Sequence, residues 1–182
     1  MKPKLLLHAC CAPCLSYSLE YLTPDYNVTV YFYNPNIMPL PEYEKRLADV
    51  RRLVRISGVK FMVGEYDNET FLPLAKGLET FREGGVRCER CIRHRLTKTA
   101  EFAKKHYFDL FSTTLTISPH KNAKFINDTQ AELEAAIGVK SLPLDLKKKG
   151  GFLRSIELSR ALNLYRQNYC GCRFDIADEV DS

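Results

Sequence analysis

The sequence predicts an α/β fold in which a parallel sheet carries helices on both faces. Short runs rich in apolar and β-branched residues alternate with longer segments of helical character along most of the chain. Glycine ends two of the longest helical segments, at Gly58 and Gly138. Hydrophobic residues make up 45% of the 182 residues, enough for one core, and no linker or repeat interrupts the pattern. We therefore expect a single α/β domain over residues 1–182.

Four segments are predicted as strands. Residues 4–8 form a short apolar run at the start of the chain, and residues 27–33 read NVTVYFY, which is rich in β-branched and aromatic residues. The other two are residues 59–63 and 108–115. Since each strand is followed by a helical segment, the strands are expected to lie parallel.

Six segments are predicted as helices, and the last of them gives the fold a helical C-terminal part. The first follows a cysteine-rich turn and ends near residue 22, and a proline-broken loop, NPNIMPLP, precedes the second. The remaining predicted helices are residues 42–56, 69–76, 92–106, 122–137 and 155–165.

The seven cysteines fall into three short groups. The N-terminal residues contain no complete apolar signal segment, and no stretch approaches a membrane span, so we expect a cytoplasmic protein. A reducing cytoplasm disfavours structural disulfides, so metal binding or redox chemistry is the better explanation of this clustering. The groups are Cys10, Cys11 and Cys14; Cys88 and Cys91; and Cys170 and Cys172.

The first group lies in the stretch HACCAPC, directly after the first predicted strand. In an open α/β sheet ligands bind beyond the carboxyl ends of the strands, and cysteines stand here where a nucleotide-binding protein would carry a glycine-rich loop. Cys11 and Cys14 alone form a C-x-P-C motif, which predicts a thiol–disulfide oxidoreductase as one alternative. That alternative leaves five cysteines without a role.

Metal binding explains more of the cysteines. Four thiolates from Cys10, Cys11, Cys88 and Cys91 suit either a tetrahedral zinc site or an iron–sulfur cluster, and the spacing leaves both open. The pair Cys170 and Cys172 suits a dithiol that forms a strained disulfide, or two ligands of an additional metal.

Polar residues near two predicted strand ends are candidates for ligand contacts. His8 ends the first strand and either lines the site or hydrogen-bonds the backbone. Ser118, His120 and Lys121 follow the fourth strand, where hydroxyls and amides can hold a phosphate, although Ser118 is also a candidate helix cap. The net charge of +5 suits a polyanionic partner without requiring one.

Four stretches together resemble the cobalamin-independent epoxyqueuosine reductase family, QueH: HACCAPC, GGVRCERC, STTLTISPHKN and YRQNYCGCRFD. They span residues 8–175 and occur in the order of that family. The resemblance implies a Rossmann-like sheet similar to the PP-loop ATPase/adenine nucleotide alpha-hydrolase-like fold. It implies reduction of the epoxide of epoxyqueuosine at the wobble position of a tRNA with a GUN anticodon, which is the last step of queuosine synthesis.

The resemblance also implies residue roles. Cys10, Cys11, Cys88 and Cys91 would bind a [4Fe-4S] cluster. Cys170 and Cys172 would be a catalytic redox pair, and Cys14 would lie near a second iron. Ligation of that iron is the alternative role for Cys170 and Cys172. Independently of the resemblance, their positions near predicted strand ends make His8, Ser118, His120 and Lys121 the residues expected to contact the substrate. The candidates for the proton donor are Tyr169, Asp175, His8 and His120.

The sequence does not identify the electron donor, and we expect one of the low-potential ferredoxin or flavodoxin type. Two other classes of protein remain as alternatives to the reductase. One is the thiol–disulfide oxidoreductase, and the other is a zinc-stabilised tRNA-binding module without catalysis.

Overall fold

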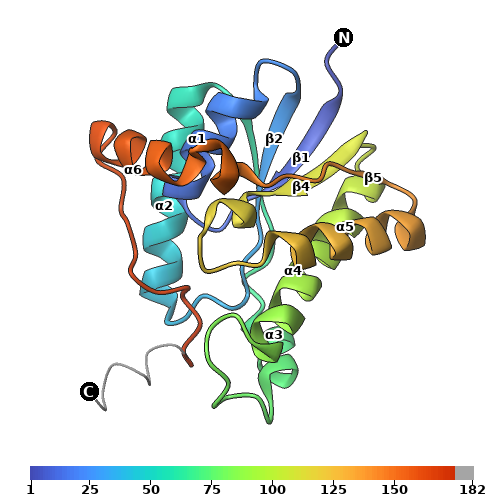
Figure 1. The fold of residues 1–182 in the computed structure, drawn as a ribbon, viewed down its shortest axis with the longest axis vertical. Helices are drawn as coiled ribbons and strands as arrows, with labels where there is room; N and C mark the ends of the chain where they lie inside the picture. The colour runs from blue at the N-terminus through green and yellow to red at the C-terminus, as the bar shows by residue number, and fades with distance from the viewer. Residues whose placement is uncertain (175–182) are drawn as a thin grey trace.

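A computed structural model of the chain describes residues 1–174, so Asp175 lies outside the described residues. Its centre is a five-stranded sheet in the order β3-β2-β1-β4-β5, with every neighbouring pair parallel (Figure 1). The strands are β1 (Lys4–His8), β2 (Asn27–Phe32), β3 (Lys60–Val63), β4 (Leu110–Thr113) and β5 (Lys140–Ser141).

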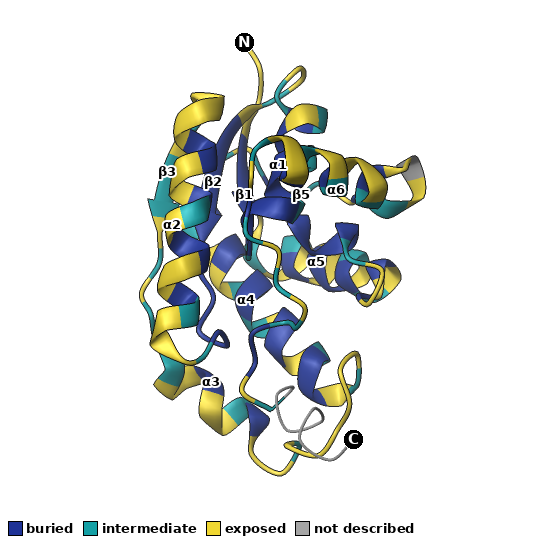
Figure 2. Ribbon diagram, turned by 90° about the vertical axis from the view of Figure 1, so that its left-hand side faces the viewer, coloured by how far each residue is buried: buried dark blue, intermediate teal, exposed yellow. Residues whose placement is uncertain are grey.

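Helices cover both faces of the sheet, which confirms the predicted fold class (Figure 1). They are α1 (Ala12–Leu22), α2 (Leu40–Ser57), α3 (Asn68–Ala75), α4 (Val86–Lys105), α5 (Ala123–Ile137) and α6 (Gly151–Ala161), with short 3-10 helices η1 (Thr114–Ile117) and η2 (Leu146–Lys149). Figure 2 shows the buried residues of these helices turned inward and the exposed ones outward.

Alternating side chains of β1 supply two hydrophobic cores. Leu5 and Leu7 pack with α1 and α2 on one face, whereas Leu6 packs with α4 and α5 on the other. All three leucines are fully buried, as expected for a central strand of a parallel sheet. The alternation fixes the register of β1, since a shift by one residue would exchange the two cores.

The predicted strand 108–115 is shorter in the structure, where β4 ends at Thr113 and η1 follows it. Three further differences are larger. β5 was not predicted, because two residues give no hydrophobic pattern to recognise. α4 begins at Val86 rather than at residue 92, with Gly85 at its N-terminal cap, so Cys88 and Cys91 lie inside the helix. α6 covers Gly151–Ala161 rather than residues 155–165, and an extended segment follows it.

The strand order places a topological switch point between β1 and β4. From β1 the chain crosses over to β2 on one side, and β4 pairs with the other side of β1. The loops that leave the carboxyl ends of β1 and β4 therefore diverge and open a crevice, the usual ligand position in such sheets. Cys10 and Cys11 follow β1, and Ser118 to Lys121 follow β4 and η1.

Residues 162–174, here called the C-terminal strap, run back along α2 (the red segment of Figure 1). Arg52 donates hydrogen bonds to the carbonyl oxygens of Leu162 and Asn163, at 2.9 and 2.7 Å. The backbone N–H of Tyr165 donates to Asp49 at 2.8 Å. These bonds tie the strap to a helix of the core and carry its cysteines to the crevice.

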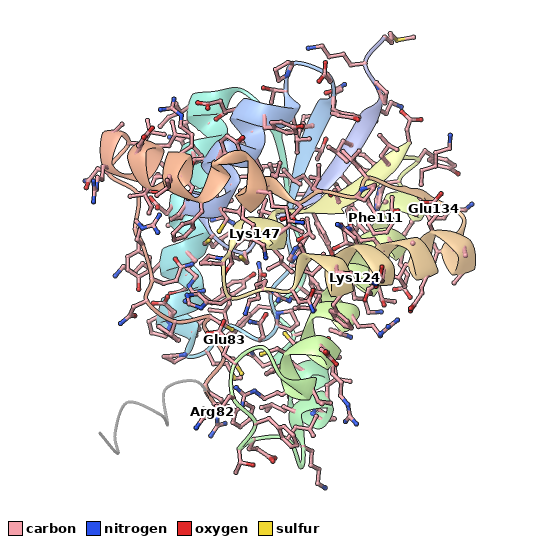
Figure 3. All side chains as sticks on the ribbon, viewed as in Figure 1. Arg82, Glu83, Phe111, Lys124, Glu134 and Lys147 are labelled. Carbon is pink, nitrogen blue, oxygen red and sulfur yellow. The ribbon has the colours of Figure 1, made fainter. Side chains whose placement is uncertain are left out.

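Glu134 joins α5 to the edge strand β5 and is expected to contribute to stability (Figure 3). Its carboxylate accepts hydrogen bonds from the backbone N–H and the hydroxyl of Ser141, both at 2.8 Å, and these bonds lower the pKa of Glu134. Replacement of Glu134 with alanine should lower the free energy of unfolding by about 1 kcal/mol in urea titrations. Glu132→Ala removes only an exposed ion pair to Arg93 and should cost less than about 0.5 kcal/mol. Equal losses in the two variants would contradict this account.

Candidate active site

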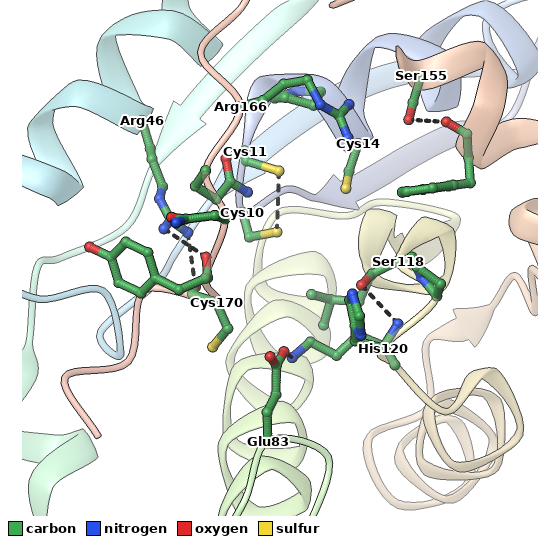
Figure 4. A pocket seen from close by; sticks show the side chains of 18 of the residues that line it. Cys10, Cys11, Cys14, Arg46, Glu83, Ser118, His120, Ser155, Arg166 and Cys170 are labelled. Carbon is green, nitrogen blue, oxygen red and sulfur yellow. Dashed lines mark hydrogen bonds and ion pairs between the residues drawn. The ribbon is translucent and has the colours of Figure 1, made fainter. Parts of the chain in front are cut away.

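A cavity of about 340 Å³ lies at the carboxyl ends of β1 and β4 (Figure 4). Most of its lining comes from four segments: the cysteine turn after β1, the loop after η1, the start of α6 and the C-terminal strap. Single residues of other elements complete it: Arg46, Glu83, Arg95 and Leu115. In Figure 4, Cys10, Cys11 and Cys14 lie along one side, and Ser118 and His120 lie across from them. The cavity therefore brings together residues that are more than 150 positions apart in the sequence.

The first cysteine group forms the turn into α1, with Cys11 at the helix N-cap. The sulfur atoms of Cys10 and Cys11 are 3.8 Å apart. Hydrogen bonds from the Cys11 and Cys14 thiols lower the pKa of Cys10 well below its ordinary value, and the same contact with Cys10 raises the pKa of Cys11 to about 12. A C-x-P-C oxidoreductase needs its first cysteine as the thiolate. The thiolate is favoured at Cys10 instead, outside that motif.

The second and third cysteine groups meet in a smaller cavity beside the first. Cys88 and Cys91, on the first two turns of α4, line it together with Cys170 and Cys172 of the strap. Cys170 also lines the larger cavity. All seven cysteines are therefore distributed over two adjoining cavities that share Cys170.

Buried cations accompany the sulfur atoms. Arg95 and Lys121 line both cavities and are 3% and 8% exposed. Burial alone would lower the pKa of Arg95. Negative charge on the nearby sulfurs has a larger opposite effect, so the pKa is raised; these sulfurs belong to Cys91, Cys10, Cys170 and Cys88. Its Nε has no hydrogen-bond partner among the described residues, and one Nη donates to Asn34 at 3.3 Å. Such cations stabilise negatively charged thiolates.

Arg46, on α2, is 1% exposed and was not identified from the sequence. Its guanidinium donates to the carbonyl oxygens of Cys170 and Tyr169, at 2.8 and 3.1 Å, and to the Glu42 carboxylate at 2.6 Å. It also lines the larger cavity beside Cys10 and Cys11. Arg46 therefore links the strap to the cysteine turn, a role that depends on tertiary contacts and leaves no sequence signal.

His8 lies beneath the cavity and does not line it. Burial and the charge of Arg95 lower the pKa of His8 from 6.5 to about 4, so the ring is neutral. Its Nε2 donates to the carbonyl oxygen of Tyr33 at 3.1 Å, and its Nδ1 therefore accepts from the Thr113 hydroxyl at 2.9 Å. These bonds join the ends of β1, β2 and β4 and favour a supporting role. A direct substrate contact by His8 stays a prediction.

The predicted residues after β4 do line the cavity: Ser118, His120 and Lys121. Lys121 pairs with Glu83 at 2.6 Å, and the Ser118 hydroxyl accepts from the backbone N–H of His120 at 3.3 Å. Ser118 does not cap the N-terminus of α5, which the side chain of Asn122 caps, and Ser118 instead ends η1 as its C-cap residue. Among the candidate proton donors, Tyr169 and His120 line the cavity.

Comparison with known proteins agrees with this arrangement. Residues 5–178 match the family described as Epoxyqueuosine reductase QueH. The protein of that name from Streptococcus pyogenes serotype M1 is 42% identical over 178 residues, which cover 94% of this chain and 70% of the relative. The protein of that name from Thermotoga maritima is 38% identical over 96% of this chain and 91% of the relative.

A solved structure shares the fold at low sequence identity. It is the U34-tRNA thiolase NcsA from Methanococcus maripaludis with its [4Fe-4S] cluster. The TM-score is 0.57 at 13% identity, over 99% of this chain and 67% of that chain, which agrees with the predicted fold class. The match over most of the length, together with the relatives' identity, shows that this chain belongs to the epoxyqueuosine reductase QueH family.

Proposed function

We propose that this protein reduces the epoxide of epoxyqueuosine at the wobble position of tRNA, which yields queuosine. The observation that carries the proposal is the cavity that collects Cys10, Cys11, Cys14 and Cys170 beside buried cations, in a chain of the QueH family. Conversion of an epoxide to an alkene and water consumes two electrons and two protons. The cavity therefore has to admit the cyclopentane ring of the modified base, and its surroundings have to supply the electrons and the protons.

The cofactor proposed here is a [4Fe-4S] cluster held by Cys10, Cys11, Cys88 and Cys91. The chemistry of the donor set fits it, since thiolates are the usual ligands of such clusters and the buried Arg95 offsets their charge. Among residues 1–174, no three His, Cys, Asp or Glu side chains converge on a single-ion position, and a four-iron cluster needs more widely spaced thiolates than one ion. When bound, the cluster would pass electrons singly and offer an iron to polarise the epoxide oxygen.

The remaining cysteines are proposed for the redox step. Cys170 lies at the junction of the two cavities, so the pair Cys170 and Cys172 is proposed to store two electrons as a dithiol. The alternative, a second iron held by this pair with Cys14, is less favoured, because no three such side chains converge on one ion position among residues 1–174. Ser118, His120 and Lys121 are proposed to contact the substrate. Tyr169 or His120 would protonate the leaving oxygen, since both reach the cavity wall.

The proposed partners follow from the reaction. The substrate is a tRNA with a GUN anticodon, and the basic net charge of +5 suits its phosphates. The electrons would come from a low-potential ferredoxin or flavodoxin. No helix of the described residues is long and apolar enough to cross a membrane, and the proposed substrate is found in the cytoplasm.

The test of this proposal is metal and sulfide analysis of protein purified without oxygen, followed by turnover of tRNA that carries epoxyqueuosine. Iron and acid-labile sulfide in near-equal, multiple amounts per chain, with formation of queuosine, are the expected results. Zinc without turnover would favour the tRNA-binding module. A metal-free protein with disulfide exchange activity would favour the C-x-P-C oxidoreductase.

Arg95 is expected to tune the proposed cluster. Arg95→Gln removes a buried positive charge beside Cys10, Cys88 and Cys91, so reduction of the cluster becomes less favourable. We expect the midpoint potential in an EPR-monitored titration to fall by several tens of millivolts. Arg93→Gln on the same helix removes a half-exposed charge paired with Glu132 and should shift the potential little. A rise, or equal shifts in both variants, would contradict this role of Arg95.

A further inference from the structure

Gln167 has an unused hydrogen-bond acceptor at the proposed reaction cavity. It belongs to the C-terminal strap, and the cavity that it lines also holds the cysteines of the first turn. Its side-chain Oε1 is buried and has no hydrogen-bond partner among the described residues. A buried acceptor without a donor is costly, so a bound group that donates an N–H or O–H would be favoured at this position.

Two flat groups line the same cavity. The Arg166 guanidinium lies over the Phe152 ring, 6.0 Å from its centre, and both residues border the cavity. Arg166 also donates to the Ser159 hydroxyl at 3.4 Å, which braces its side chain. Aromatic rings and guanidinium planes are the surfaces on which unstacked nucleobases bind. The wall that carries Gln167 therefore suits a planar ligand with polar edges.

We propose that Gln167 reads the base edge of the substrate nucleotide by accepting a hydrogen bond from its N1–H or its 2-amino group. This inference rests on the proposed function, in which the reacting base derives from 7-deazaguanine. Such a base has two adjacent N–H donors on its Watson–Crick edge, next to one carbonyl acceptor. A side-chain amide can match that edge, since Oε1 accepts and Nε2 donates. Gln167 is thus assigned as a specificity-determining residue, separate from the sulfur chemistry.

The first experiment compares Gln167→Leu with Gln167→Glu in the iron-loaded enzyme. Leucine removes the acceptor at similar size, and kcat/KM for tRNA carrying epoxyqueuosine should fall roughly a hundredfold. Glutamate keeps acceptor oxygens for both N–H groups, so kcat/KM should stay within about fivefold of the wild type. If Gln167 served only the packing of the strap, a buried carboxylate would be at least as harmful as leucine. A Gln167→Glu variant that is no more active than Gln167→Leu would therefore overturn the proposal.

The second experiment measures binding and needs no turnover. Fluorescence anisotropy would give the Kd of anticodon stem-loops with guanosine, inosine or N1-methylguanosine at position 34. Inosine lacks the 2-amino group and N1-methylguanosine lacks the N1–H. At least one substitution should weaken binding to the wild type by about tenfold, and Gln167→Leu should lose that difference. A difference that persists in Gln167→Leu, or none in the wild type, would overturn the assignment.

A matched control is Gln130→Leu. The Oε1 of Gln130 is also buried without a partner among residues 1–174, but Gln130 lies on α5 and does not line the cavity. Its discrimination among the three stem-loops should equal that of the wild type. The two proposals fail separately: a wild type that cannot form queuosine refutes the proposed function, whereas a wild type that forms it while Gln167→Leu is equally active refutes only the role of Gln167.

Discussion

Replacement of Cys88 with alanine is expected to give a protein that folds but lacks the proposed cluster. Cys88 is 7% exposed on the first turn of α4, and alanine suits both a buried position and a helix. The loss of one of four proposed thiolate ligands should remove the visible absorbance and most of the iron. Epoxyqueuosine reduction should fall by roughly three orders of magnitude or more. Cys10→Ala should behave in the same way.

Cys170→Ala is the contrasting variant. Because Cys170 is proposed for the redox step rather than as a cluster ligand, this variant should keep its iron and sulfide but lose turnover. Absorbance, metal content and queuosine formation would be measured on the same anaerobic preparations. Full activity in Cys88→Ala would refute the assignment of Cys88 as a cluster ligand. Loss of iron in Cys170→Ala would indicate that Cys170 is itself a cluster ligand. Circular dichroism would verify that both variants are folded.

The sequence allowed the sheet to be predicted because its strands carry a local signal. Residues 4–8 are apolar throughout, as a central parallel strand requires, and the structure has β1 at those residues. The start of α4 was missed because VRCERC is polar and charged on the faces where a helix usually shows an apolar stripe. Its buried Cys88 and Cys91 line the smaller cavity, and Cys91 packs in a small cluster with Phe71, Ala75 and Cys172, apart from the two main cores.

Site residues could be predicted where reactive residue types lie close together in the sequence. They could not be predicted where the fold brings distant residues together. The cysteines were found because they cluster in three short groups, and the loop after β4 was found because its polar residues follow a predicted strand. Arg46 is one of several arginines on α2, and only its position opposite Gly171 distinguishes it from exposed neighbours such as Arg51. Gln167 stands out only because its acceptor is buried beside a cavity.

Gly171 is the point at which the strap passes closest to Arg46, and its replacement with alanine is expected to have a large effect. Its φ is +100°, a conformation that L-residues rarely adopt. A Cβ there would lie 2.9 Å from an Nη of Arg46 and 3.1 Å from Cγ1 of Ile37. Arg46 is held by the carbonyl oxygen of Cys170, so it cannot retreat without breaking that bond.

Gly171→Ala should therefore lower the free energy of unfolding by about 2–4 kcal/mol, from backbone strain and steric overlap together. Displacement of Cys170 should also reduce kcat by roughly a hundredfold. The matched control is Gly77→Ala. Gly77 also has a positive φ, of +77°, but a Cβ there would meet nothing within 4 Å, so only about 1 kcal/mol of strain is expected. Urea titration and single-turnover kinetics would be measured for both variants. If they lose equal stability and Gly171→Ala keeps its kcat, then the contact between the strap and Arg46 does not position Cys170.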